Sequence, residues 1–298
     1  MIALALLLQL QVSGPIQVSG QVLRVVEGDS IPAAGARATL HRVGSTVQGA
    51  IDSTTAGPDG RFSFRARIDS GDVLLASARW HGVEYFAEPV ISGSPVRVMV
   101  ADTSSIAPVN VAARHVIIGG PAADGSRDVV DLVVLRNSGS LTRAVADSAH
   151  EGSWWMRLPP LIANVQVGDA DFSVDAFDVH GDTLMLFAPI PPGERQFFLQ
   201  YQVAPGAKSL RIPFANVTDT VSILAEESNL ELPEGFVLQG RETVSGRTFT
   251  RWSGSGVLEM VEVEFPGDGS LPDWVLPALV VLVALPLVWV TWRVVAKR

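Results

Sequence analysis

The sequence predicts an all-β fold of two tandem β-sandwich domains, first a prealbumin-like one and then a larger immunoglobulin-like one, followed by one C-terminal transmembrane helix. Three observations lead to this prediction. Apolar and polar residues alternate with a period of two in many short segments, as they do in strands that place one face on a core. The 27 glycines and 19 prolines are spread between those segments as turn signals. A run without charged residues, from Trp274 to Trp292, follows the last predicted strand.

The first domain is expected over residues 15–103. Alternation is clear in residues 61–68, where two phenylalanines share one face and the arginines share the other, and again in residues 96–100. Turn signals at residues 32–35 and 57–60 separate such segments. About seven short strands in some 90 residues are typical of a small sandwich.

Four segments of this domain follow a known pattern, with a Pro-x-x-Gly turn ahead of an Asp-Gly-x-Phe-x-Phe strand. They are residues 20–22, 31–40, 52–55 and 59–64. In them the chain resembles carboxypeptidase regulatory-like domains, which are transthyretin-like seven-stranded sandwiches often grouped with carbohydrate-binding-like folds. The resemblance covers under a third of the chain. It implies a non-catalytic accessory module and does not imply peptidase activity.

The second domain is expected over residues 107–268, after a short joint. About ten strands suggest a larger sandwich of immunoglobulin-like or related form. No family resemblance marks this half. Its predicted strands are residues 128–136, 153–158, 165–168, 183–190, 195–203, 210–214, 220–225, 236–240, 248–252 and 257–265.

The C-terminal run predicts a membrane anchor over residues 274–292, because about 19 helical residues span roughly 28 Å, close to the hydrocarbon thickness of a bilayer. Trp274 at one end, and Trp289 and Trp292 at the other, are typical of membrane interfaces. Arg293 begins a short basic tail, residues 293–298, which the positive-inside rule places in the cytoplasm.

Residues 1–14 are expected to be a secretory signal peptide, since an apolar run too short to span a bilayer opens the chain. An uncleaved N-terminal strand is the alternative. With the anchor, this predicts a single-pass protein whose two domains lie outside the cytoplasm, in the periplasm or at the cell surface.

Charge and cysteine content exclude several classes of function. The formal net charge is −9, and because the segment after Trp274 carries three positive charges and no acid, the remainder carries −12. This argues against binding to nucleic acid and against electrostatic adhesion to anionic lipid. The chain has no cysteine, which excludes disulfides, a lipoprotein anchor and thiolate metal or redox sites.

No catalytic residue is predicted, and no cofactor is expected apart from a candidate Ca²⁺ site. The five histidines are scattered singly, and no metalloprotease, nucleophile-elbow or phosphate-loop motif occurs. The best acidic cluster contains Asp169, Asp171 and Asp175. It resembles the start of a calcium loop, but Val174 and His180 occupy the positions that need glycine and glutamate. Acidic solvent-facing residues on a hairpin are the plainer interpretation.

Aromatic residues offer a candidate sugar site. Trp80, Tyr85 and Phe86 flank a predicted hairpin turn and would form a stacking platform if they were exposed together. The alternative is that they pack the hairpin or face the second domain. Trp154 and Trp155 should point to opposite faces of a strand, so that one is core and the other marks a contact surface.

Three functions are consistent with these sequence features. The leading hypothesis is a non-catalytic, membrane-anchored binding or assembly protein that presents tandem β-sandwiches to another envelope protein. The alternative is a carbohydrate-binding envelope protein that uses exposed aromatic residues. The third is a calcium-assisted hydrolase in the second domain, which requires two converging carboxylates. The expected partners are the lipid bilayer, an envelope protein and a candidate glycan, with no nucleic acid.

Overall fold

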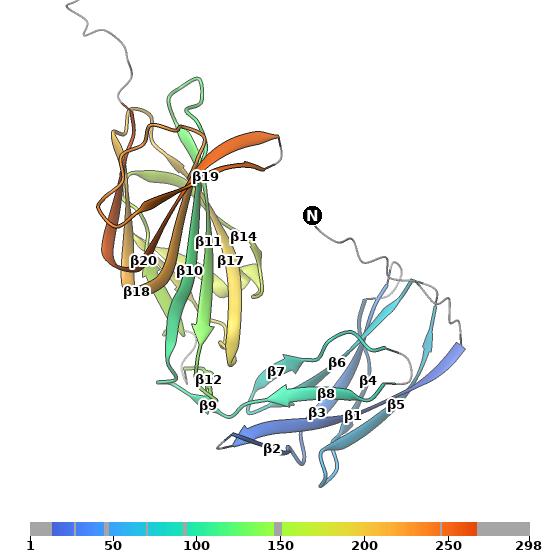
Figure 1. Cartoon of the computed structure of the whole chain (residues 1–298). Coiled ribbons are helices and arrows are strands. Elements are labelled where there is room, and N and C mark those ends of the chain that lie inside the picture. The colour runs from blue at the N-terminus through green and yellow to red at the C-terminus, as the bar shows by residue number, and fades with distance from the viewer. Residues whose placement is uncertain are drawn as a thin grey trace, which may run out of the picture.

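The computed structural model describes residues 14–266, apart from residues 27, 45–47, 70, 92–93, 146–150 and 245. These residues form two β-sandwiches joined by a short connection (Figure 1). The predicted all-β architecture of β-sandwiches is therefore confirmed for these residues. No helix in the described part of the chain is long and apolar enough to cross a membrane. The predicted anchor, residues 274–292, the tail and nearly all of the predicted signal peptide lie outside the described residues.

The first sandwich has eight strands among its described residues, one more than expected. Strand β1 lies inside one sheet, where β5 and β2 pair in succession along one of its edges and β8 pairs in parallel along the other. The second sheet has the order β4-β3-β6-β7. The strands are β1 (Gly14–Val26), β2 (Asp29–Pro32), β3 (Arg37–Val43), β4 (Gln48–Thr55), β5 (Arg61–Ile68), β6 (Val73–Trp80), β7 (Val83–Phe86) and β8 (Val96–Val100).

The core of the first sandwich is rich in alanine, which lets the two sheets approach closely. Phe62 and Phe64 are buried in it, as the alternation in residues 61–68 predicts. Gly20 on β1 faces one of these rings. A Cβ atom built there would lie 2.4 Å from Cζ of Phe62 and 2.5 Å from the carbonyl oxygen of Val96. The buried alanines are Ala33, Ala36, Ala38, Ala56, Ala76, Ala78 and Ala101.

Two short strands connect the sandwiches. Strand β9 (Thr103–Ser104) follows the first sandwich and pairs in parallel with β12 (Thr142–Arg143), which belongs to a loop of the second. The Thr142 amide donates to the Asp102 carbonyl oxygen at 2.8 Å, and the Ala144 amide donates to the Ser104 carbonyl oxygen at 3.1 Å. The joint is therefore a hydrogen-bonded contact between domains.

The second sandwich is built on a seven-stranded sheet of order β14-β17-β11-β10-β18-β20-β19, with the small sheet β13-β16-β15 on one face. Its aromatic and aliphatic core lies between these sheets. Its elements are β10 (Val109–Ile118), β11 (Arg127–Asn137), β13 (Trp154–Arg157), β14 (Ile162–Ala170), the 3₁₀ turn η1 (Val174–Ala176), β15 (Phe177–His180), β16 (Thr183–Leu186), β17 (Gly193–Val203), β18 (Ser209–Ala225), β19 (Val237–Val244) and β20 (Arg247–Glu264).

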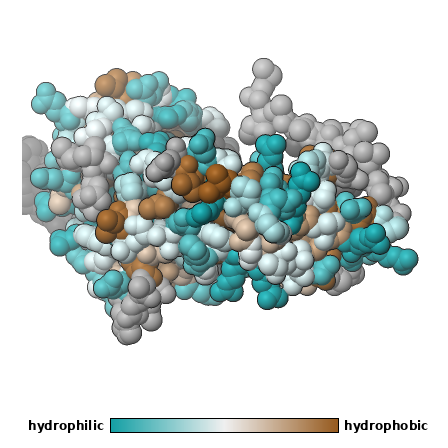
Figure 2. Space-filling model, turned by 90° about the horizontal axis from the view of Figure 1, so that it is seen from below, coloured by the Kyte–Doolittle hydropathy of each residue, from teal (hydrophilic) through white to brown (hydrophobic). Residues whose placement is uncertain are grey.

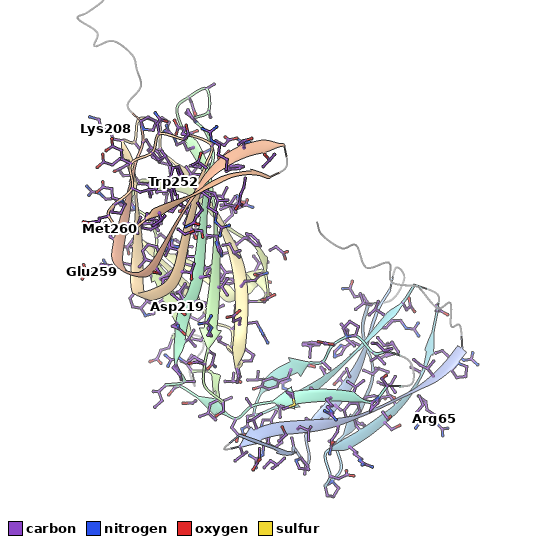
Figure 3. All side chains as sticks on the ribbon, viewed as in Figure 1. Arg65, Lys208, Asp219, Trp252, Glu259 and Met260 are labelled. Carbon is purple, nitrogen blue, oxygen red and sulfur yellow. The ribbon has the colours of Figure 1, made fainter. Side chains whose placement is uncertain are left out.

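Strands β18 and β20 form a long antiparallel pair with an irregularity near its middle. Their register shifts between Phe214 and Thr218, and Glu259 on the opposing strand has a φ of +64°. Such a bulge bends a strand pair. Glu259 and its neighbour Met260 lie on the outer side of this strand pair (Figure 3). The bend lets both halves of β18 contribute buried residues to the same core.

An ion pair is buried in the second sandwich. Arg114 on β10 is 3% exposed and Asp131 on β11 is fully buried. Nη2 of Arg114 donates to Oδ2 of Asp131 at 2.6 Å, and Nη1 donates to the Pro213 carbonyl oxygen at 2.8 Å. Burial lowers the pKa of Arg114, but the charge and hydrogen bonds of Asp131 together with Tyr201 outweigh it, so the pKa is raised and the guanidinium stays charged. The phenyl ring of Phe214 packs 4.9 Å from the guanidinium carbon.

Several strand predictions for this half differ from the structure. The expected strands 210–214 and 220–225 are one strand, β18, and the expected strands 248–252 and 257–265 are one strand, β20. Gly254 and Gly256 continue the strand where the composition predicts a turn. Strand β10 was not predicted. Its register shifts between Val111 and Ala113, which interrupts the period-two pattern.

Candidate functional site

A groove of ≈ 1310 Å³ lies between the two sandwiches. The first sandwich contributes strands β7 and β8 and the segment between them, and the second contributes loops near residues 138–140, 171–172 and 189–195. Hydrophobic side chains gather near the middle of the molecule, where the sandwiches meet (Figure 2). The groove is therefore formed by both domains.

Exposed apolar side chains line this groove. Phe86 is 60% exposed, Ile91 is 73% exposed and Met99 is 43% exposed. Apolar side chains this accessible, gathered in one concave surface, are typical of an interaction site. Further apolar lining comes from Pro89, Pro95, Phe172, Pro189, Pro191 and Pro192.

Strands β7 and β8 are edge strands of the two sheets of the first sandwich. The Ala87 amide donates to the Ala76 carbonyl oxygen at 2.9 Å on β6. Hydrogen-bonded pairs alternate along an antiparallel ladder, so the backbone amides and carbonyls of Glu84 and Phe86 point away from β6. The groove thus offers backbone hydrogen-bonding groups as well as apolar side chains.

Tyr85 is buried and holds the two domains together. Its hydroxyl donates to the Ala101 carbonyl oxygen at 2.8 Å and lies 2.7 Å from Oγ1 of Thr142 in the second sandwich. Since the phenol has one proton and gives it to Ala101, Thr142 is the donor in the second bond. Burial raises the pKa of Tyr85. Its ring packs in the first core, and its hydroxyl forms hydrogen bonds to both sandwiches.

Trp80 is also engaged within the protein. Its Nε1 donates to Oδ1 of Asp102 at 2.8 Å, and the same carboxylate accepts from Nη1 of Arg24 at 3.0 Å. The His81 ring stacks on the indole at 4.7 Å between centroids, and the Arg24 guanidinium lies 5.8 Å from it. The indole nitrogen of Trp80 and part of its ring are therefore already in contact with other residues of the protein.

The three aromatic residues predicted as a sugar platform are not brought together. Phe86 is exposed on the opposite side of β7 from buried Tyr85, and its ring lies 5.4 Å from that of His41. Phe86 alone of the three faces the groove as an accessible ring. The alternative interpretation is that these residues pack the hairpin or face the second domain. Trp80 stacks on His81 of the hairpin turn, and Tyr85 reaches Thr142 of the second domain.

The three aspartates predicted as a calcium site do not converge. Asp169 is the penultimate residue of β14, Asp171 lines the groove and Asp175 lies in the turn η1, all exposed. Oδ2 of Asp171 accepts from the Gln196 amide at 2.9 Å, which ties its loop to β17. Among the residues that the structure describes, no three His, Asp or Glu side chains lie close enough together to hold a metal ion.

Trp154 and Trp155 divide between core and surface, as expected for neighbours on a strand. Trp154 is buried and packs edge-on against Phe197 at 5.9 Å, whereas Trp155 is 50% exposed. The predicted membrane anchors lie beyond the last described residue, 266. They are Trp274, Trp289, Trp292 and Arg293.

Comparisons with known proteins leave the family open. No family model matches the chain, and no curated protein matches it. A search of solved structures finds a likeness to the major pilin subunit BcpA of Bacillus cereus, with 11% sequence identity and a TM-score of 0.22. The likeness covers 83% of this chain and 87% of the pilin. A TM-score this low carries no argument about function.

Sequence reasoning missed the groove. Ile91, Met99 and the prolines at 189, 191 and 192 are far apart in the chain, and only the joint between the domains brings them together. A signal was present in Phe86, which is adjacent to an inward-facing tyrosine on a short strand and therefore has to face outward.

Proposed function

We propose that this chain is a non-catalytic, membrane-anchored binding or assembly protein that presents its two sandwiches outside the cytoplasm to an envelope protein. The observation that carries the proposal is the groove between the sandwiches, where Phe86, Ile91 and Met99 are exposed. The apolar run before Arg293 supports the anchor, and its flanking charges support the orientation.

The occupant that suits the groove is an extended, apolar segment of the partner. The backbone groups of Glu84 and Phe86 on edge strand β7 would pair with such a segment as with an added strand. Phe86 and Ile91 would pack against the apolar side chains of the partner segment. Prolines along the walls, such as Pro89 and Pro191, offer apolar contact without amide donors that need partners.

The proposal extends to the identity of the two domains. The first is assigned to the carboxypeptidase regulatory-like group, and the positive φ angles of Gly35 (+79°) and Gly60 (+74°) in its two turns support the pattern that the sequence shows. The second is assigned to a form related to immunoglobulin-like sandwiches, supported by its two packed antiparallel-rich sheets.

Site-specific photocrosslinking in the native membrane tests this function. A photoreactive residue at Phe86 in the full-length chain should capture one reproducible envelope protein, and Ile91→Asp in the same chain should abolish that capture. The matched control is the same photoreactive residue at Ile51, a 37% exposed position on β4, which does not line the groove. Equal capture from both positions would rule out the groove as the binding site.

A further inference from the structure

One sheet face of the first sandwich is strongly basic. Arg61, Arg65 and Arg67 alternate along β5 with buried residues, so all three project outward, and Arg97 projects from β8 on the same sheet. Arg65 is labelled on the outer side of this sandwich (Figure 3). We call these four residues the arginine face.

The arginine face is ordered by the strand register. Gln21 on β1 is paired with Arg61 on one side and with Arg97 on the other, and Gln17 is paired with Arg65. Successive outward residues on a strand lie about 7 Å apart, so the arginines of β5 form a row about 20 Å long. Gln17, Ser19 and Gln21 form a neutral hydrogen-bonding strip beside it.

Most of this positive charge is uncompensated. Arg61 lies 3.5 Å from Asp59, but among the described residues Arg65, Arg67 and Arg97 form no ion pair. The other sheet of the sandwich has mixed signs on its outer face, where Arg79 is paired in register with Glu84.

We propose that the arginine face binds a linear acidic polysaccharide. Guanidinium groups pair bidentately with carboxylates, and the row on β5 repeats them along one direction, as a chain with repeating acidic units requires. The amide nitrogens of Gln17 and Gln21 donate to Ser63 Oγ and to the Asp59 carbonyl oxygen. Their amide oxygens, together with the hydroxyl of Ser19, would bond sugar hydroxyls between those units. Among the described side chains of this face, Met99 is the one large apolar side chain that is exposed, so these residues lack the apolar groups that insert into a bilayer.

This site is separate from the groove that carries the proposed function, although Arg97 and Met99 border both. Arg65 and Arg67 do not line the groove. Substitutions at these two positions therefore test the arginine face without altering the groove, and capture from Phe86 by photocrosslinking should not change in them.

The test is a binding titration of the full-length chain, held in nanodiscs of neutral phosphatidylcholine, with polygalacturonate as the acidic glycan. The double substitution R65Q/R67Q should weaken binding at least tenfold, by about 1.4 kcal/mol or more, and salt at about 0.3 M should weaken the native interaction further. The control R37Q/R79Q removes the same charge from the outer face of the opposite sheet and should leave affinity unchanged. Thermal unfolding of both variants should match the native chain, since these side chains are exposed.

The other outcomes would overturn the proposal. Equal weakening by R37Q/R79Q would mean that net charge, and not this face, attracts the glycan. Binding of polyglutamate as tight as that of polygalacturonate, with the same dependence on Arg65 and Arg67, would assign the face to an acidic protein. Binding only to vesicles that contain phosphatidylglycerol would assign it to a membrane surface, and no binding to any probe would leave the arginines as a solvated face.

Discussion

The two sandwiches differ in what their cores contain. In the described part of the first, the buried side chains are almost all apolar, with Ser77 the exception, and seven of them are alanines. The second encloses larger side chains together with the buried pair of Arg114 and Asp131 and several buried polar groups. A core of small residues depends on close backbone approach, whereas a buried charge depends on its oppositely charged partner.

Each domain should therefore be sensitive to a different kind of substitution. Added volume should harm the first sandwich most, and a lost hydrogen-bond partner should harm the second most. Three substitutions test this contrast, and the largest effect is expected in the second sandwich.

Replacing Asp131 with alanine should destabilise the second sandwich by about 3–5 kcal/mol, because Arg114 is left charged and buried without its carboxylate. The free energy of unfolding of the full-length chain in denaturant measures this loss. The double substitution of Arg114 and Asp131 to leucine should recover most of it.

The control for this change is a surface ion pair of the same domain. Arg136 pairs with Glu194 at 2.9 Å and with Asp219 at 2.6 Å, and all three side chains are partly exposed. Glu194→Ala should cost less than about 1 kcal/mol. A loss as large as that of Asp131→Ala would remove the distinction between a buried and an exposed charge on which the comparison rests.

Replacing Gly20 with alanine should destabilise the first sandwich by about 1–3 kcal/mol through overpacking. The new methyl group would meet Phe62 and, more seriously, the backbone carbonyl of Val96, so β8 would have to move away from β1. Gly168→Ala on β14 is the matched control, because its nearest neighbour would be at 3.5 Å, an ordinary contact. If thermal unfolding showed equal effects for both substitutions, close backbone approach would not be the special feature of the first core.

Replacing Tyr85 with phenylalanine should cost about 0.5–1.5 kcal/mol and weaken the coupling between the sandwiches, because Thr142 loses its partner. The pH dependence sharpens this test. Burial raises the pKa of Tyr85 in the folded chain, so stability is fully present below the unfolded value, about 10, and is lost as pH rises through the folded pKa.

Unfolding curves at about pH 8 and about pH 11 should therefore differ less for Tyr85→Phe than for the native chain. The same curves show whether the two domains unfold together. A native chain that already unfolds in two separate transitions, unchanged by this substitution, would mean that the joint does not couple them.

Period-two alternation was sufficient to predict the all-β architecture and the buried Phe62 and Phe64, because that signal is local. Strand β10 escaped prediction because its register shift breaks the period, and the continuity of β18 and β20 escaped because glycines and prolines within them look like turns. Local sequence does not encode the pairing of β9 with β12, so the groove between the domains could not be predicted from the sequence. The burial of Tyr85 and the engagement of Trp80 depend on Thr142 and Asp102, which are distant in the chain.

The parallel pairing of β1 with β8 joins the first and last strands of the first sandwich, from Gly20 opposite Val96 to Arg24 opposite Val100. While the chain is being synthesised, β1 has no neighbour on that edge until the whole domain has emerged. Pairing of strands this far apart in the chain loses loop-closure entropy before the stabilising contacts form, so this pair forms late and slowly. Until then the β1 edge is open to pairing with other nascent chains.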